Sequence, residues 1–174
     1  MTSNATLLSR YELSFAGFVE HKLLRPLGEN EKTRWLYVTQ ELETLLRGQS
    51  GDNQFPSTDA DVVVGRFCKG HIVSVTAKPS GKADFKRLSG LDEAWTMTFP
   101  GPGSGWRLFG RFARKNIFVG LICLSRNACA PRAIYDAKAA EMIAGWESKW
   151  AAPPLRRASL IEYLGENHFD KDAE

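Results

Sequence analysis

The chain has 174 residues, of which 43% are hydrophobic and 25% are charged, and its formal net charge is +3. This length allows one domain with a substantial core, and the composition excludes a disordered or fibrous chain. The longest apolar run, IFVGLICL at residues 117–124, is too short to cross a bilayer. The N-terminus lacks the charged and apolar regions of a signal peptide, so we expect a cytoplasmic protein with no membrane partner.

The front of the chain has the pattern of one strand followed by two helices. We expect a strand at residues 10–15, a short helix at residues 16–24 and a longer helix at residues 29–48, where apolar residues recur at helical spacing. Residues 48–61 are rich in Gly, Ser, Asn, Asp and Pro, which is typical of a loop.

The rest of the chain is dominated by strand patterns. We expect two strands at residues 61–67 and 71–78, joined by a tight turn, and then a basic connector at residues 78–93. The segments AWTMTF, GWRLFGRF and NIFVGLICLS predict three more strands, the last of them apolar on both faces as in the centre of a sheet. Residues 134–150 have a helical pattern, and the tail is expected to add a short helix at residues 159–164 before it frays.

This order of elements predicts an α+β fold with two layers. An N-terminal strand and helices would pack on a twisted, mainly antiparallel sheet, with a C-terminal helix. We expect a single domain over residues 1–174. Within it, residues 1–50 hold the strand and two helices, residues 51–80 are an insertion, residues 81–150 hold the sheet core and last helix, and residues 151–174 form a tail.

The charge is distributed unevenly along the chain. Residues 66–133 contain 12 Lys or Arg and only 3 Asp or Glu, whereas the segments on either side are each net negative. Such a basic block favours polyanionic partners such as RNA, DNA or an acidic protein segment. A solvated basic surface with no partner fits the same counts.

The strand pattern around GWRLFGRF separates two faces. Trp106 and Phe112 fall on one side, which is typical of a core face, whereas Arg107, Phe109 and Arg111 fall on the other. The two arginines would lie about 13–14 Å apart with an aromatic ring between them. We expect this face to meet a polyanion, with phosphates on the arginines and a base on the ring. An ordinary solvent-facing strand, or a face covered by a helix, fits the same alternation.

Several motifs follow one another in a familiar order. A basic stretch with a Leu-x-Gly-like turn (KRLSGL) precedes a strand that begins with an aromatic residue (WTMTF), an aromatic–Arg strand (GWRLFGRF), an apolar strand (NIFVGLICLS) and a helix (YDAKAAEMIAGWESKW). This order resembles the core of RelE/HigB-type toxins of bacterial toxin–antitoxin systems, most closely over residues 85–150. The resemblance implies a metal-independent endoribonuclease that cleaves mRNA at the ribosome and is held inactive by a protein antitoxin.

The resemblance also implies roles for individual residues. In RNA cleavage the 2′-hydroxyl attacks the phosphate, so a base, cations and an acid are needed. The candidate catalytic residues are Arg107 and Arg126 for the phosphate, Lys86 as the base, and Tyr135 as the acid or a stacking platform. A solvated loop at Lys86 and a half-buried aromatic residue at Tyr135 are the structural alternatives.

Further residues of the basic block are candidates for RNA binding without a part in the chemistry. Those residues are Phe109, Arg111, Lys82, Arg87, Arg114 and Lys115.

Two other functions remain open at this point. One is a non-catalytic binding protein of the same fold, such as a gyrase poison or an inhibitor that docks an acidic protein surface. The other is a non-toxic RNA-binding module. The three cysteines, Cys68, Cys123 and Cys129, follow no metal-binding spacing, so we expect reduced thiols and neither a metal nor another cofactor.

Overall fold

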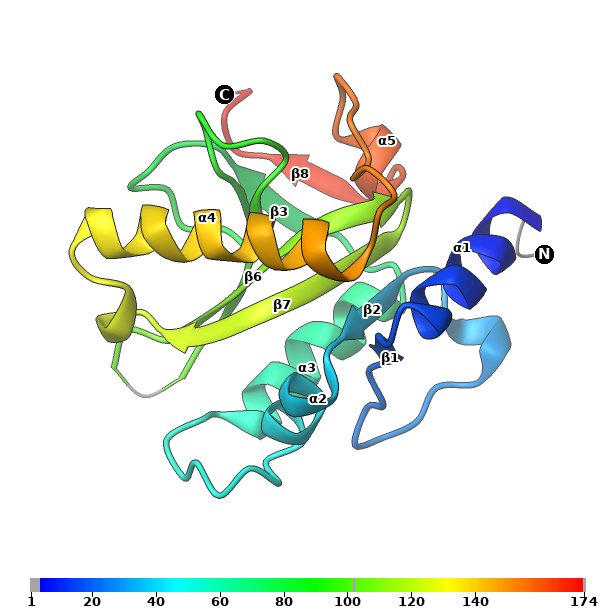
Figure 1. Cartoon of the computed structure of the whole chain (residues 1–174), viewed down its shortest axis with the longest axis horizontal. Coiled ribbons are helices and arrows are strands. Elements are labelled where there is room, and N and C mark those ends of the chain that lie inside the picture. Colours follow the sequence, from blue (N-terminus) through cyan, green and yellow to red (C-terminus); the bar gives the residue numbers. More distant parts are fainter. Residues whose placement is uncertain (1–3, 102, 174) are drawn as a thin grey trace.

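A computed structural model of the chain describes residues 4–101 and 103–173. Its centre is an eight-stranded mixed sheet with the strand order β1-β2-β7-β6-β5-β4-β3-β8 (Figure 1). The strands are β1 Val19–Glu20, β2 Trp35–Val38, β3 Val73–Thr76, β4 Phe85–Arg87, β5 Trp95–Phe99, β6 Trp106–Arg114, β7 Ile117–Ser125 and β8 His168–Asp170. The pairs β2–β7, β3–β4 and β3–β8 are parallel and the others antiparallel. The α+β class is confirmed, but the sheet is mixed.

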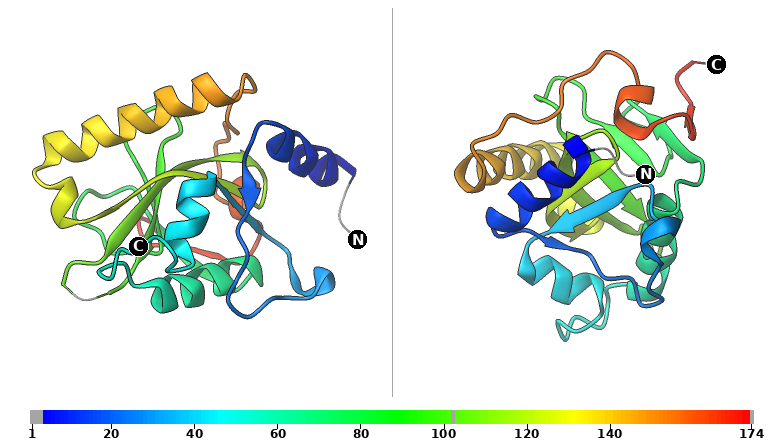
Figure 2. Two further views of the ribbon diagram at one scale, coloured as in Figure 1. Left: turned by 60° about the horizontal axis from the view of Figure 1, so that its bottom comes forward. Right: turned by 90° about the vertical axis from the view of Figure 1, so that its right-hand side faces the viewer.

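Helices cover both faces of the sheet. They are α1 Asn4–Phe15, α2 Gln40–Leu46, α3 Ser57–Cys68, α4 Arg132–Lys149 and α5 Ile161–Leu164. Helix α4 lies along one face, and α2 and α3 lie against the other (Figure 2). On the α3 side, Phe67, Phe85 and Trp95 belong to one buried cluster, whereas on the α4 side Phe109 and Met142 belong to another. None of the helices within the described residues is long and apolar enough to span a bilayer.

The strands β5, β6 and β7 lie where the sequence predicts them. The turn between β6 and β7 has Asn116 at a φ of 66°, a conformation that Asn tolerates well in tight hairpins. Before β6, Gly105 has a φ of 74°, and a Cβ atom there would lie 2.5 Å from the carbonyl oxygen of Phe99. The return from β5 to β6 therefore requires glycine.

The front of the chain differs from its prediction. Residues 10–15, expected as a strand, belong to α1, and residues 16–24, expected as a helix, contain β1. The long helix expected at residues 29–48 is β2 followed by α2. All four residues of β2 are buried, because this strand runs parallel to β7 between two covered faces. An apolar run that also fits helical spacing is here a buried strand.

Helix α3 replaces a predicted strand. The valines of residues 61–67 favour a strand, yet Val64 and Phe67 are fully buried while Val62 is exposed, which is a helical pattern of burial. Tertiary contacts outweigh the intrinsic preference of β-branched residues at this place. Residues 51–80, expected as an insertion, supply α3 to the core and β3 to the sheet.

The tail is an ordered part of the sheet. The expected short helix corresponds to α5, but the following residues form β8 beside β3 instead of fraying. The buried Arg34 holds this segment, since its guanidinium donates 2.7 Å hydrogen bonds to the carbonyl oxygens of Leu164 and Asn167. The C-terminal segment is therefore held by the residue just before β2 as well as by β3.

Candidate functional site

A cavity of about 240 Å³ opens beside the start of β6 and the start of α4. Five cationic side chains line it, and its lining includes no carboxylate. We call it the basic pocket, and its charged and polar residues are Ser80, Lys82, Lys86, Arg107, Arg126, Arg132, Tyr135 and Cys129. Lys86, Arg107 and Tyr135 are half-buried, whereas the other three cations are exposed. The pocket thus has an inner group and an outer rim.

The sheet register brings Lys86 and Arg107 to the same face. Lys86 of β4 pairs with Thr96 of β5, and Arg107 of β6 pairs with Thr98, two residues further along β5. Residues directly opposite each other, and residues two apart on a strand, share a face of the sheet. Arg126 follows the end of β7, whose last residue pairs with the residue before Arg107. Lys86, Arg107 and Arg126 therefore come from three separate strand segments and lie at one corner of the sheet.

Helix α4 forms the remaining wall of the pocket. Tyr135, in its first turn, has its hydroxyl group 3.2 Å from the Thr96 hydroxyl. Its ring lies over that of Phe109, with 4.9 Å between the ring centroids. Phe109 is fully buried beneath this helix and cannot stack on an RNA base, contrary to the prediction.

Arg111 shares a face of β6 with Arg107 but does not reach the basic pocket. It is only 1% exposed, and its guanidinium donates to the backbone carbonyl of Asp92 and lies 3.2 Å from the Asp92 carboxylate. The same group lies 5.7 Å from the ring centroid of Trp146 in α4. The expected RNA contact at Arg111 is therefore replaced by a structural contact between the sheet and α4.

Arg87 points away from the basic pocket. Successive residues of a strand point to opposite faces, so Lys86 and Arg87 cannot serve the same site. The Arg87 guanidinium donates a 2.7 Å hydrogen bond to Glu93 and lies over the rings of Trp95 and Tyr163. Its predicted contact with RNA does not fit this placement.

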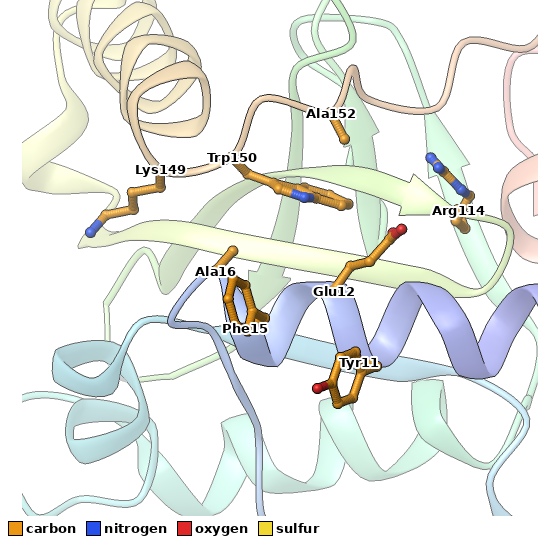
Figure 3. A pocket seen from close by; sticks show the side chains of 8 residues that line it. All are labelled: Tyr11, Glu12, Phe15, Ala16, Arg114, Lys149, Trp150 and Ala152. Atoms are coloured by element: carbon orange, nitrogen blue, oxygen red, sulfur yellow. The ribbon is translucent and has the colours of Figure 1, made fainter.

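Arg114 and Lys115 lie at the other end of β6. Seven residues separate Arg114 from Arg107, which corresponds to about 23 Å along a strand. Arg114 lines a separate open groove of about 720 Å³ between α1 and the end of α4, together with Phe15 and Trp150 (Figure 3). Lys115 belongs to the β6–β7 turn. These two cations are outside the basic pocket.

Four of the five cations of the basic pocket have no counter-ion among the residues that the structure describes. Among the ion pairs of the described residues, none involves Lys82, Lys86, Arg107 or Arg126. Arg132 is paired with Asp136 at 2.7 Å on the surface of α4. Mutual repulsion of clustered cations makes the arrangement favourable for an anion.

The pKa shifts in the pocket follow from burial and crowding. Burial, and then the charges of Arg107, Arg126 and Arg132, lower the pKa of Lys86. Burial also lowers the pKa of Arg107, which stays charged because an arginine pKa starts so high. Lys86 thus loses its proton more readily than an ordinary lysine.

The neutral groups of the pocket are shifted the other way. Burial raises the pKa of Tyr135, although its hydrogen bond with Thr96 and the charge of Arg107 oppose this effect. Burial likewise raises the pKa of the Cys129 thiol. Both groups therefore keep their protons near neutral pH. Within the described ranges, no three His, Cys, Asp or Glu side chains are grouped closely enough to hold a metal ion.

The structure brings together several of the candidate residues from the sequence, and the pocket contains others as well. Lys82, Lys86, Arg107, Arg126 and Tyr135 were predicted and do converge. Arg132 and Cys129 also line the pocket, and no local pattern in the sequence singles them out. Arg132 lies in the first turn of α4, a helix that follows Arg126 closely.

Comparisons of the chain with protein-family models, with curated proteins and with solved structures gave no match. The assignment of a function therefore depends on the geometry and chemistry of the basic pocket.

Proposed function

We propose that the basic pocket binds the phosphates of RNA and that the chain is a RelE/HigB-like, metal-independent endoribonuclease that cleaves mRNA at the ribosome. The observation that carries this proposal is the convergence of five cations from separate segments on one cavity with no lining carboxylate. A surface that merely kept the protein soluble would mix both signs of charge. Arginine and lysine together are also the residues that bind RNA phosphates.

The order of elements gives the proposal further support. In the part of the chain where the resemblance is closest, residues 85–150, the antiparallel strands β4 to β7 are followed by α4. This is the order that the resemblance implies for its basic stretch, its three strands and its last helix. We propose that this part holds a toxin-like core, although the eight-stranded sheet is larger than the RelE fold.

The proposed mechanism uses the inner group of the pocket and Arg126 from its rim. Arg107 and Arg126 hold the scissile phosphate and stabilise the charge on the phosphorane. Unprotonated Lys86 takes the proton of the 2′-hydroxyl, whose oxygen attacks phosphorus to form a 2′,3′-cyclic phosphate. As the bond to the 5′-oxygen breaks, Tyr135 donates its proton to that oxygen, and solvent then restores both side chains.

The same pocket suggests how the activity would be silenced. An antitoxin segment rich in carboxylates would compete with RNA for the unpaired cations of the pocket. We propose such a protein antitoxin as the second partner of the chain.

Binding without cleavage is the second candidate function. The observation that favours it is the burial of Phe109 and Arg111, which removes two of the three predicted contacts of the β6 face with RNA. The remaining pocket is small enough to hold one phosphate group or one carboxylate of an acidic protein surface, as in a gyrase poison or an inhibitor. This alternative requires the cations but no proton transfer by Lys86 or Tyr135.

A translation assay with mapped transcript ends separates the two functions. The wild-type chain is expected to stop translation and to produce new RNA ends, whereas Arg107→Ala is expected to do neither. Arg114→Ala is the matched control, because it removes the same charge from the same strand outside the pocket. Arrest with intact transcripts would indicate binding without cleavage, and equal behaviour of the two variants would refute the site.

A further inference from the structure

One wall of the basic pocket is a loop without regular structure. Residues 79–82, between β3 and β4, line the cavity with Pro79, Ser80, Gly81 and Lys82. The backbone bond within this loop runs from the Gly81 N–H to the Lys78 carbonyl at 3.1 Å. The position of this wall therefore depends on contacts with other segments.

The C-terminal segment supplies these contacts from outside the pocket. Because β8 runs parallel to β3, the residues after β8 continue alongside the start of the loop. The Lys171 N–H donates to the Val75 carbonyl at 2.9 Å, and its ammonium group donates to the Lys82 carbonyl at 2.6 Å. The Lys171 side chain thus reaches the last residue of the pocket wall.

Asp172 forms hydrogen bonds with the residues that lead from β3 into this loop. One carboxylate oxygen accepts a 2.7 Å hydrogen bond from the Thr76 hydroxyl, and the other accepts from the Ala77 N–H. These hydrogen bonds also hold the pKa of Asp172 below its usual value. Lys78 lies 3.8 Å from this carboxylate.

The loop is also held from within the pocket. The ammonium group of Lys86 donates a 2.6 Å hydrogen bond to the Pro79 carbonyl. Gly81 lies so close to Thr76 that a Cβ atom at this position would be 2.6 Å from the Thr76 hydroxyl oxygen. Hydrogen bonds from Lys171 of the C-terminal segment and from Lys86 of the pocket therefore both hold the 79–82 loop.

We propose that Lys171 and Asp172 are positioning residues that hold the 79–82 wall of the basic pocket in the form that binds a polyanion. The identification of the polyanion as RNA rests on the proposed function, whereas the hydrogen bonds that hold the loop do not depend on it. By holding the Lys82 backbone, Lys171 sets where the Lys82 side chain meets the ligand. The C-terminal segment would then control affinity without touching RNA.

The direction in which one substitution changes the RNA affinity distinguishes this proposal from simple electrostatics. Asp172 is a negative charge whose field reaches Lys86, so its removal should strengthen the binding of a polyanion if only charge matters. A positioning role gives the opposite result, because Asp172→Ala releases the loop. We therefore expect Asp172→Ala to weaken RNA binding even though it makes the protein more positive.

The experiment measures the dissociation constant of the full chain for a fluorescent single-stranded RNA 12-mer at constant salt. Asp172→Ala and Lys171→Ala are expected to weaken binding about threefold to tenfold, the effect of one or two lost hydrogen bonds. Lys171→Arg is expected to restore binding, since it can still donate to the Lys82 carbonyl. Glu166→Ala is the charge-matched control, because Glu166 is an exposed residue of the same segment.

Amide hydrogen exchange provides a readout that needs no RNA. Exchange at residues 77–82 is expected to accelerate in Asp172→Ala and to stay unchanged in Glu166→Ala, while thermal unfolding shows that the variants remain folded. Unchanged exchange in this loop, or RNA binding by Asp172→Ala as tight as or tighter than that of the wild-type chain, would overturn the proposal.

Parallel measurements keep this proposal separate from the proposed function. If Arg107→Ala and Arg126→Ala weaken RNA binding while the tail variants do not, the positioning role fails and the basic pocket stands. If RNA binding is absent or insensitive to both arginines, the proposed function fails. The exchange rates at residues 77–82 then decide whether the tail holds the loop.

Discussion

Two parts of one sheet face differ sharply although they share the strand β6. Near the start of α4, Arg107 emerges at the edge of the helix and joins four other cations around a cavity. Two and four residues further along, Phe109 and Arg111 lie beneath α4 and contact Tyr135 and Trp146. The place where a helix begins thus decides which residues of a strand can meet a ligand and which hold the fold together.

The largest effect is expected when a buried side chain is removed from the part of the β6 face that α4 covers. Phe109→Ala removes a fully buried ring between β6 and α4 and should lower the free energy of unfolding by about 3–5 kcal/mol. Urea unfolding followed by tryptophan fluorescence measures this loss. Phe109→Leu, which keeps most of the volume, should cost clearly less. A change below about 1 kcal/mol for Phe109→Ala would mean that the ring is not packed under α4.

The opposite behaviour is expected at the open part of the face. Arg107→Ala should reduce RNA cleavage about 10²–10³-fold, as for the loss of one donor to a developing anion, and should change stability little. Single-turnover cleavage of a labelled RNA measures the loss. Arg107→Lys should recover only part of the rate, because a lysine cannot bind two phosphate oxygens with a planar fork. Full activity of Arg107→Ala would place the chemistry elsewhere.

Arg111→Ala tests the difference between the two parts of the face, because it removes the same charge as Arg107→Ala but four residues further along β6. We expect the free energy of unfolding to fall by about 1–3 kcal/mol, because the contacts with Asp92 and Trp146 are lost. RNA affinity of the folded variant should remain close to that of the wild-type chain. Denaturant unfolding and RNA binding, measured on the same sample, check both parts. Weak RNA binding at unchanged stability would contradict this division of roles.

The lowered pKa of Lys86 predicts the pH dependence of cleavage. A base acts only when it is unprotonated, so the rate should rise with pH until Lys86 has lost its proton. The lowered pKa moves this rise toward neutrality from where an ordinary lysine would place it. Lys86→Arg keeps a positive charge at every accessible pH and should remove the rise while RNA binding persists. The same rise in Lys86→Arg would exclude Lys86 as the base.

The smallest effect is the change in RNA affinity expected at the rim of the pocket. Arg126→Ala should reduce the slope of log affinity against log salt concentration by about 0.7, the value for one lost phosphate contact with a single strand. Binding titrations between low and moderate salt measure the slope. Arg114→Ala should leave the slope unchanged, because that residue lies in the separate groove beside α1. An equal reduction in both variants would indicate diffuse attraction.

The sequence allowed good predictions where the local pattern and the tertiary environment agree. The strands β5 to β7 and the helix α4 were predicted close to their observed positions, because alternation and helical periodicity there match the burial. The prediction failed at β2, whose four buried residues carry no alternation, and at α3, whose valines favour a strand. Burial on both faces of an element removes the signal that a single sequence can offer.

The site was predicted in part for a similar reason. Alternation placed Arg107, Phe109 and Arg111 correctly on one face of β6, but no local pattern states how far a distant helix covers that face. Arg87 was misplaced because the sequence predicts a connector at residues 78–93, whereas residues 85–87 form β4, in which Lys86 and Arg87 must point apart. The role of the tail beside the pocket depends on a β3–β8 pairing between segments nearly 100 residues apart.

The most direct test of the account compares two charge-matched double variants of the full chain in one RNA-binding and cleavage assay. Arg107→Ala/Arg126→Ala removes two charges from the basic pocket, and Arg111→Ala/Arg114→Ala removes two charges from elsewhere on β6. We expect the first variant to lose both affinity and cleavage while the second, when folded, keeps them. Equal losses in the two variants would show that affinity follows net charge alone and would contradict the basic pocket as the functional site.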